Sequence, residues 1–132
     1  MAFVLDVSVT AAWAFSDEVN PHAFAILSRM DKDHALVPPL WWFEVRNVLI
    51  VNERRKRITE SATAAFLRRL AQLPIQVESL PQEPAILRLA RAHGLSVYDA
   101  AYLELAMREG ISLATEDAGL VRAATAEAVT LL

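Results

Sequence analysis

Short apolar segments alternate with longer segments of helical spacing along the whole chain, and this alternation constrains the fold more than any other feature. Segments of strand length cover residues 3–5, 35–37, 75–79, 111–115 and 129–132. We expect helices over 22–30, 40–57, from Thr59 onward, and over 81–93, 97–109 and 117–124. Strands and helices that alternate in this way form a mostly parallel sheet with helices on both faces. We therefore predict one α/β domain over residues 1–132, a three-layer α/β/α sandwich with about five strands.

Composition narrows the class of protein. A hydrophobic content of 55% in 132 residues excludes a disordered chain. No apolar run approaches the ~20 residues of a membrane helix, and the first residues lack a basic export signal, so we expect a cytoplasmic protein. Zinc-ribbon, disulfide and thiol chemistry are excluded because the chain has no cysteine. The net charge of −3 means that any polyanion must be bound by a local patch or through cations.

Four carboxylates lie where predicted strands end or predicted helices begin. They are Asp6 in FVLDVSV, Glu44 in WWFEVRNVL, Asp99 in SVYDAAYLELA and Asp117 in LATEDAGL. Asp6 and Asp117 follow strands directly, and functional groups gather at the carboxyl ends of parallel strands. Acids at this edge repel one another unless a cation lies between them, and Mg²⁺ and Mn²⁺ prefer oxygen ligands. The pattern predicts metal-assisted hydrolysis of phosphodiester bonds.

Each acid also has a purely structural interpretation. Asp99 and Asp117 could be helix N-terminal carboxylates, which the helix dipole and free N–H groups favour. Glu44 could be a solvated acid of an early helical turn. Asp6 is harder to explain in this way, because it closes an apolar strand and the burial of an unpartnered carboxylate is costly.

Three polar residues are placed to support these acids. Asn47 lies one turn beyond Glu44 on the same helix face, where it could orient the carboxylate or bind a water. Ser8 and Thr115 carry hydroxyls beside Asp6 and Asp117. Local capping of the backbone is the alternative role for both hydroxyls.

Arginines and tryptophans raise two further possibilities. Arg54, Arg55 and Arg57 belong to the dense basic stretch 52–57, which could neutralise RNA phosphates or simply stabilise the end of a helix. Arg46 could contact phosphate or be solvated. The adjacent Trp41 and Trp42 cannot both face one core, so we expect one of them to be partly exposed. An exposed aromatic favours a protein interface such as a homodimer, with packing as the alternative.

The segments LDVSV, WWFEVRNVL, LSVYDAAYLELA and LATEDAGL together resemble the PIN-domain ribonucleases. The resemblance is to the toxins of VapBC-type toxin–antitoxin modules, and it spans nearly the whole chain in the family's order. It implies an endoribonuclease that depends on Mg²⁺ or Mn²⁺ and leaves a 5′-phosphate. It also implies an RNA substrate, a VapB-like antitoxin and a homodimer. The implied metal ligands are Asp6, Glu44, Asp99 and Asp117. Many relatives carry a basic residue or a further acid where this chain has Ala118 and Gly119, which leaves the number of metal ions open.

Two other classes of function compete with this hypothesis. A PIN-like domain that binds RNA or protein without cleaving would be favoured by the loss of two ligands, yet all four acids are present. A phosphatase or phosphoryl switch that uses Asp6 usually requires a second aspartate two residues later, where this chain has Ser8.

Overall fold

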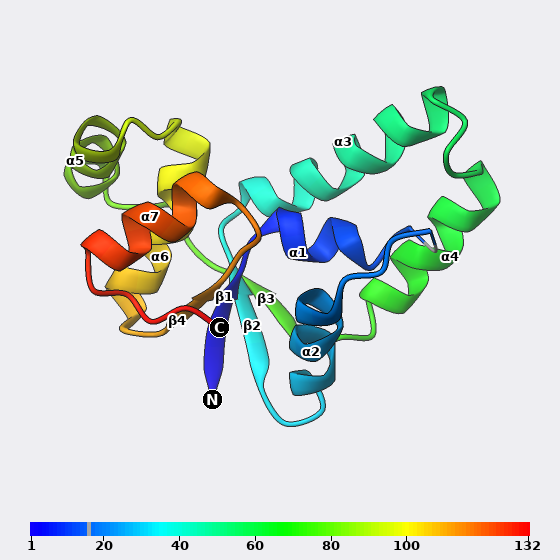
Figure 1. The fold of residues 1–132 in the computed structure, drawn as a ribbon, viewed down its shortest axis with the longest axis horizontal. Coiled ribbons are helices and arrows are strands. Elements are labelled where there is room, and N and C mark those ends of the chain that lie inside the picture. The colour runs from blue at the N-terminus through cyan, green and yellow to red at the C-terminus, as the bar shows by residue number, and fades with distance from the viewer. Residues whose placement is uncertain (16) are drawn as a thin grey trace.

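Four parallel strands form the central sheet of the computed structural model, which describes residues 1–15 and 17–132 (Figure 1). The strands are β1 (Ala2–Leu5), β2 (His34–Val37), β3 (Ile75–Val77) and β4 (Ser112–Ala114). They are arranged in the order β3-β2-β1-β4, so β1 is paired on both sides. Val4 lies opposite Leu36 on β2 and Leu113 on β4. Phe3, Val4 and Leu5 are buried because helices cover both faces of the sheet, as a continuous apolar run predicts.

Helices form the two outer layers. They are α1 (Val7–Ala12), α2 (Pro21–Arg29), α3 (Leu40–Arg54), α4 (Glu60–Leu70), α5 (Glu83–His93), α6 (Val97–Glu109) and α7 (Ala118–Ala126). The first four lie on one side of the sheet and the last three on the other (Figure 1). The chain fills β1, β2 and β3 in turn and then crosses to β4 at the opposite edge. The predicted three-layer α/β architecture is therefore confirmed, and the direction of strand order reverses between β1 and β4.

The segment 129–132, which the sequence predicts as a fifth strand, forms only an isolated bridge. Leu131 pairs with Leu113, and Leu113 exchanges hydrogen bonds with Thr130 and Leu132 at 2.9 and 3.0 Å. Ala128 has a left-handed φ of 59°, which turns the chain sharply after α7. Only one residue then comes into register with β4, so the described sheet has four strands rather than about five.

The long helix predicted over 40–57 ends at Arg54. Lys56 adopts a left-handed φ of 58°, and the Arg57 amide donates to the carbonyl of Asn52 at 2.9 Å. Such a closing hydrogen bond satisfies a free carbonyl of the last helical turn and stops the helix. The basic stretch 52–57 therefore spans the last residues of α3 and the turn towards α4, at the tip of the helical pair in Figure 1.

Helix α6 is the most deeply buried helix segment and carries part of the acidic cluster. Every residue from Ala100 to Ala106 is buried, because α6 packs on β1 and β4 and between α5 and α7. The Ser96 hydroxyl accepts a hydrogen bond from the Asp99 amide at 3.0 Å at its start, and Gly110 ends it with a φ of 66°. A helix that is buried on all sides shows little amphipathic pattern, so its orientation cannot be read from the spacing of apolar residues.

We expect Leu105→Ala to lower the free energy of unfolding by about 2–5 kcal/mol, because Leu105 is fully buried and a cavity would remain. Urea unfolding measures this loss. Met107→Ala, on the exposed side of the same helix, is the matched control and should cost less than about 1 kcal/mol. Equal losses in the two variants would contradict the placement of α6 in the core.

Candidate active site

Asp6 follows β1 directly and lies at the carboxyl edge of the sheet with only 2% of its surface exposed. Its Oδ2 atom accepts hydrogen bonds from the Ser8 hydroxyl at 2.6 Å and from the Thr115 hydroxyl at 2.7 Å. These two donors offset the cost of burying the carboxylate. They come from segments on either side of the reversal in strand order, where ligands bind in open α/β sheets.

The two hydroxyls also bind backbone. The Ser8 oxygen accepts from the Glu116 amide at 2.9 Å, and the Thr115 oxygen accepts from the Asp117 amide at 3.0 Å. Ser8 therefore does not cap its own helix but joins α1 to the connection between β4 and α7. Thr115 combines the two roles that the sequence left open, because it binds the backbone locally and supports Asp6 as well.

Asp117 occupies the N-cap position of α7. Its Oδ2 atom accepts from the Leu120 amide at 2.8 Å, which is the capping role that the sequence allows. Gly119 leaves room for this carboxylate, since a Cβ atom at position 119 would lie 3.2 Å from the same oxygen.

Glu44 lies early in α3 and reaches across to α6. Its Oε1 atom accepts a hydrogen bond of 2.5 Å from the hydroxyl of Tyr102, a fully buried residue of α6. Sequence reasoning missed Tyr102. The available signal was a single phenol one turn after Asp99, in a stretch of α6 that is otherwise mostly alanine and leucine.

Electrostatic repulsion shows that the four acids form one cluster. Burial is the main cause that raises the pKa values of Asp6, Glu44 and Asp99 above their usual range. The charge of Asp117 raises the pKa values of Asp6 and Asp99 further. The charges of Asp6 and Asp99 do the same for Glu44. Two loops and two helices thus bring four carboxylates within electrostatic reach of one another.

Comparison with known proteins identifies the family of this chain. The PIN-domain family matches residues 3–126. This chain belongs to the PIN-domain family. It is 32% identical to Ribonuclease VapC3 of Pyrobaculum aerophilum over 120 residues. These aligned residues cover 89% of this chain and 90% of that protein.

Solved structures have the same fold. The crystal structure of PAE2754 from Pyrobaculum aerophilum is 27% identical, has a TM-score of 0.71, and covers 93% of this chain and 87% of its own. FitAcB from Neisseria gonorrhoeae is 18% identical with a TM-score of 0.67, over 100% of this chain and 96% of its own. At that identity the likeness shows the fold alone.

The carboxylates of this PIN domain do not yet converge on a common point. Within residues 1–15 and 17–132, no three Asp, Glu, His or Cys side chains are arranged so that they could hold a metal ion together.

Asn47 and Arg46 extend from α3 without joining the cluster. Asn47 is exposed, and its side chain makes no hydrogen bond to Glu44. Arg46 lies over the ring of Trp42 at 4.1 Å and donates to the Trp42 carbonyl at 3.1 Å. Trp42 is 46% exposed whereas Trp41 is 4% exposed, which confirms that one of the two tryptophans lies partly in solvent.

The remaining arginines lie at the far end of α3. Arg54 is ten residues from Glu44, which is about 15 Å along a helix. Arg54 and Arg55 are exposed, whereas Arg57 pairs with Asp17 at 3.2 Å and with Glu18 at 3.0 Å. The fold therefore separates the basic turn from the four acids.

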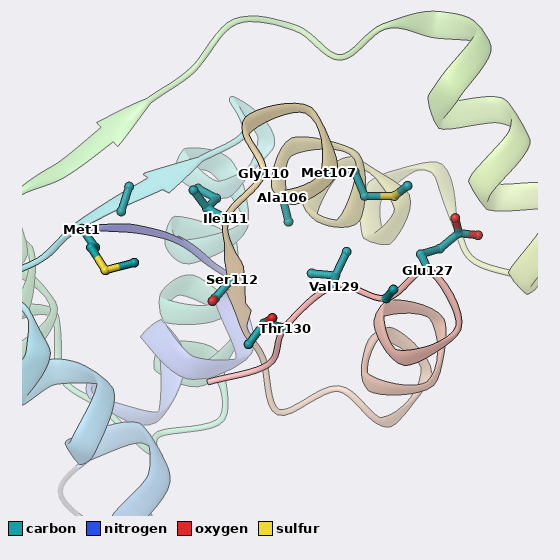
Figure 2. Close-up of a pocket in the computed structure, with 11 residues that line it drawn as sticks. Met1, Ala106, Met107, Gly110, Ile111, Ser112, Glu127, Val129 and Thr130 are labelled. Carbon is teal, nitrogen blue, oxygen red and sulfur yellow. The ribbon is translucent and has the colours of Figure 1, made fainter.

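A cavity of about 580 Å³ lies between the starts of β1 and β4, the end of α6 and the segment after α7 (Figure 2). Met107, Ile111 and Val129 are among its lining residues. Its only acid, Glu127, is already paired with Arg88 and His93. This cavity is at the amino edge of the sheet, so the acidic cluster rather than the cavity is the candidate active site.

Among the helices that the structure describes, none combines the length and the apolar character that a membrane span requires.

We expect Asp99→Asn to be more stable than the unmodified protein at pH 7, with an advantage that shrinks as the pH falls towards 4. Acids with raised pKa values hold their protons more tightly when folded, so their contribution to stability is present at low pH and is lost as the pH rises through the folded pKa. Asn at position 99 removes one charge from the cluster and relieves Glu44. Thermal unfolding across this pH range measures the difference. Glu109→Gln, at the exposed end of α6, should show no such trend; a pH-independent difference for Asp99→Asn would contradict the prediction.

Proposed function

We propose that this PIN domain is an endoribonuclease that hydrolyses RNA phosphodiester bonds with Mg²⁺ or Mn²⁺ held by carboxylates, and that it acts as the toxin of a toxin–antitoxin pair. The observation that carries the proposal is the position of four acids at the carboxyl edge of the sheet, two of them following β1 and β4 and two in early turns of α3 and α6. The identity to a protein named Ribonuclease VapC3 supports the same activity.

The donor set suits a hard divalent cation. Asp6, Asp99 and Asp117 would hold the ion, with Glu44 bound directly or through water, because carboxylate oxygens are the ligands that Mg²⁺ and Mn²⁺ prefer. A cation would also neutralise the repulsion that raises three of the four pKa values. Such an ion supplies activation of water and neutralisation of charge on the phosphate.

The histidines do not favour a metal-free mechanism that would leave a cyclic phosphate. His22 binds Glu116 at 3.0 Å and the carbonyl of Leu132 at 2.6 Å. His93 binds Glu127 at 2.6 Å, beside α7. Both rings join structural elements and are already engaged, and His34 lies at the amino end of β2, so we assign the chemistry to the carboxylates. Water attack would leave a 5′-phosphate and a 3′-hydroxyl.

RNA and protein partners complete the proposal. Arg54 and Arg55 have exposed guanidinium groups that can follow an RNA backbone, whereas Arg46 and Arg57 have other partners and would contribute less. A VapB-like antitoxin and a second copy of the chain are the proposed protein partners. The exposed Trp42 and Phe43 offer an apolar surface for one of them. Cellular RNA as substrate would place the protein in the cytoplasm.

The alternative function is that of a PIN domain that binds RNA or protein without cleaving it, and the presence of all four acids argues against it. The two functions differ in whether metal and Asp99 are needed for any reaction with RNA.

We expect the purified chain to cleave a mixed tRNA and rRNA pool in Mg²⁺ or Mn²⁺ but not in EDTA. Asp99→Asn should lose the cuts, because it removes a proposed metal ligand, and Glu109→Gln on the same helix should keep them. Sequencing of the 5′ ends should find phosphate. RNA that is bound but intact in every metal would support the non-cleaving alternative instead.

We expect millimolar Mn²⁺ to raise the melting temperature, because a cation that binds only the folded cluster stabilises the folded protein. The free energy of unfolding rises by about 2.7 kcal/mol when the free Mn²⁺ concentration is 100 times the dissociation constant. Asp6→Asn should reduce this shift, whereas Glu109→Gln should preserve it. Differential scanning fluorimetry measures all three proteins. A wild-type melting curve that Mn²⁺ does not move would count against the metal site.

A further inference from the structure

We infer that Tyr102 is a positioning residue whose hydroxyl holds the Glu44 carboxylate at the carboxyl edge of the sheet, in reach of Asp99. The relevance of this position to catalysis rests on the ribonuclease activity proposed above. The contact itself belongs to the folded chain and can be tested without RNA.

The contact joins the two helical layers. Glu44 belongs to α3 and Tyr102 to α6, which lie on opposite sides of the sheet (Figure 1). The Tyr102 hydroxyl donates to Glu44 Oε1 at 2.5 Å, across 58 residues of sequence. A hydroxyl that donates to a carboxylate at this distance makes a charge-assisted hydrogen bond, which is stronger than a neutral one. Because a phenol has a single O–H group, this donation commits the hydroxyl to Glu44.

The same helix carries a second acid of the cluster. Asp99 lies three residues before Tyr102 on α6, so the two side chains project from one face of the helix. The Asp99 amide is bound by the Ser96 hydroxyl at 3.0 Å, which sets where the helix starts. The position of α6 therefore determines both where Asp99 lies and where Glu44 is held.

Tyr102 is a constant donor to Glu44. A phenol keeps its proton at physiological pH, so the buried hydroxyl remains available to the Glu44 carboxylate. Without the hydroxyl, the Glu44 carboxylate would lose this donor.

A packing role alone would require the ring but not the hydroxyl. Tyr102 is fully buried, and a phenylalanine would fill the same space. The buried stretch of α6 holds one other polar side chain, Glu104, which is paired with Arg108 at 2.9 Å. Each polar group of this stretch thus has a dedicated partner, and for Tyr102 that partner is a proposed metal ligand.

The test is a double-mutant cycle on Mn²⁺ affinity, measured by isothermal titration calorimetry. Tyr102→Phe should weaken Mn²⁺ binding about tenfold or more, as is typical when the support of a metal ligand is lost. Tyr98→Phe, at an exposed tyrosine one turn earlier on α6, should change it less than about twofold. In a Glu44→Gln background Tyr102→Phe should have almost no further effect, because the group on which it acts is already lost.

Unchanged Mn²⁺ affinity in folded Tyr102→Phe would overturn the inference, as would an equal loss with and without Glu44. The Glu44 carboxyl ¹³C resonance of the metal-free protein provides a second measurement. It should move in Tyr102→Phe and stay in place in Tyr98→Phe; a resonance that stays in place in both overturns the positioning role. If the wild-type protein binds no Mn²⁺, the proposed metal-dependent function fails, and this resonance still decides the role of Tyr102.

Discussion

The burial of the Asp6 carboxylate is the constraint on which the rest of the acidic cluster depends. A charge with 2% exposure at the end of the central strand must be compensated by donors nearby. Ser8 supplies one from the chain that follows β1, and Thr115 supplies the other from the end of β4. Because the two hydroxyls also bind the Glu116 and Asp117 amides, this compensation aligns the ends of β1 and β4 and sets where α7 begins.

The carboxylates of the acidic cluster repel one another in the folded chain. Three of its acids have raised pKa values, so their ionised forms are less favourable in the folded chain than in the unfolded one. A site that exchanges stability for reactivity is expected to show such a local conflict. The hydrogen bonds to Asp6 and Glu44 limit the conflict without removing it. In the proposed function, a bound cation would offset the repulsion that these hydrogen bonds leave.

Much of the fold followed from local spacing, and the exceptions have local causes too. The sequence predicted the alternation of strands with helices, the position of Asp6 after β1 and the helix that begins after Thr59. The end of α3 at Arg54 was not, because Lys56 takes a left-handed conformation that is uncommon outside glycine. The segment 129–132 has the apolar character of a strand, yet only Leu131 comes into register with β4. Arg46 and Arg57 have different partners once folded, because Arg46 lies over the Trp42 ring and Arg57 pairs with Asp17.

By itself the sequence indicated that Asp6 and Asp117 follow strands and that Glu44 and Asp99 lie in early helical turns, and so that these acids reach one edge of a parallel sheet. The spacing of apolar residues and the positions of the carboxylates can both be read directly from one sequence. Only the tertiary structure decided which groups those acids meet. Thr115 reaches Asp6 across 109 residues, and Tyr102 reaches Glu44 across 58. Such pairs depend on strand order and on how α3 and α6 pack across the sheet. Spacing along the chain carries no information about either.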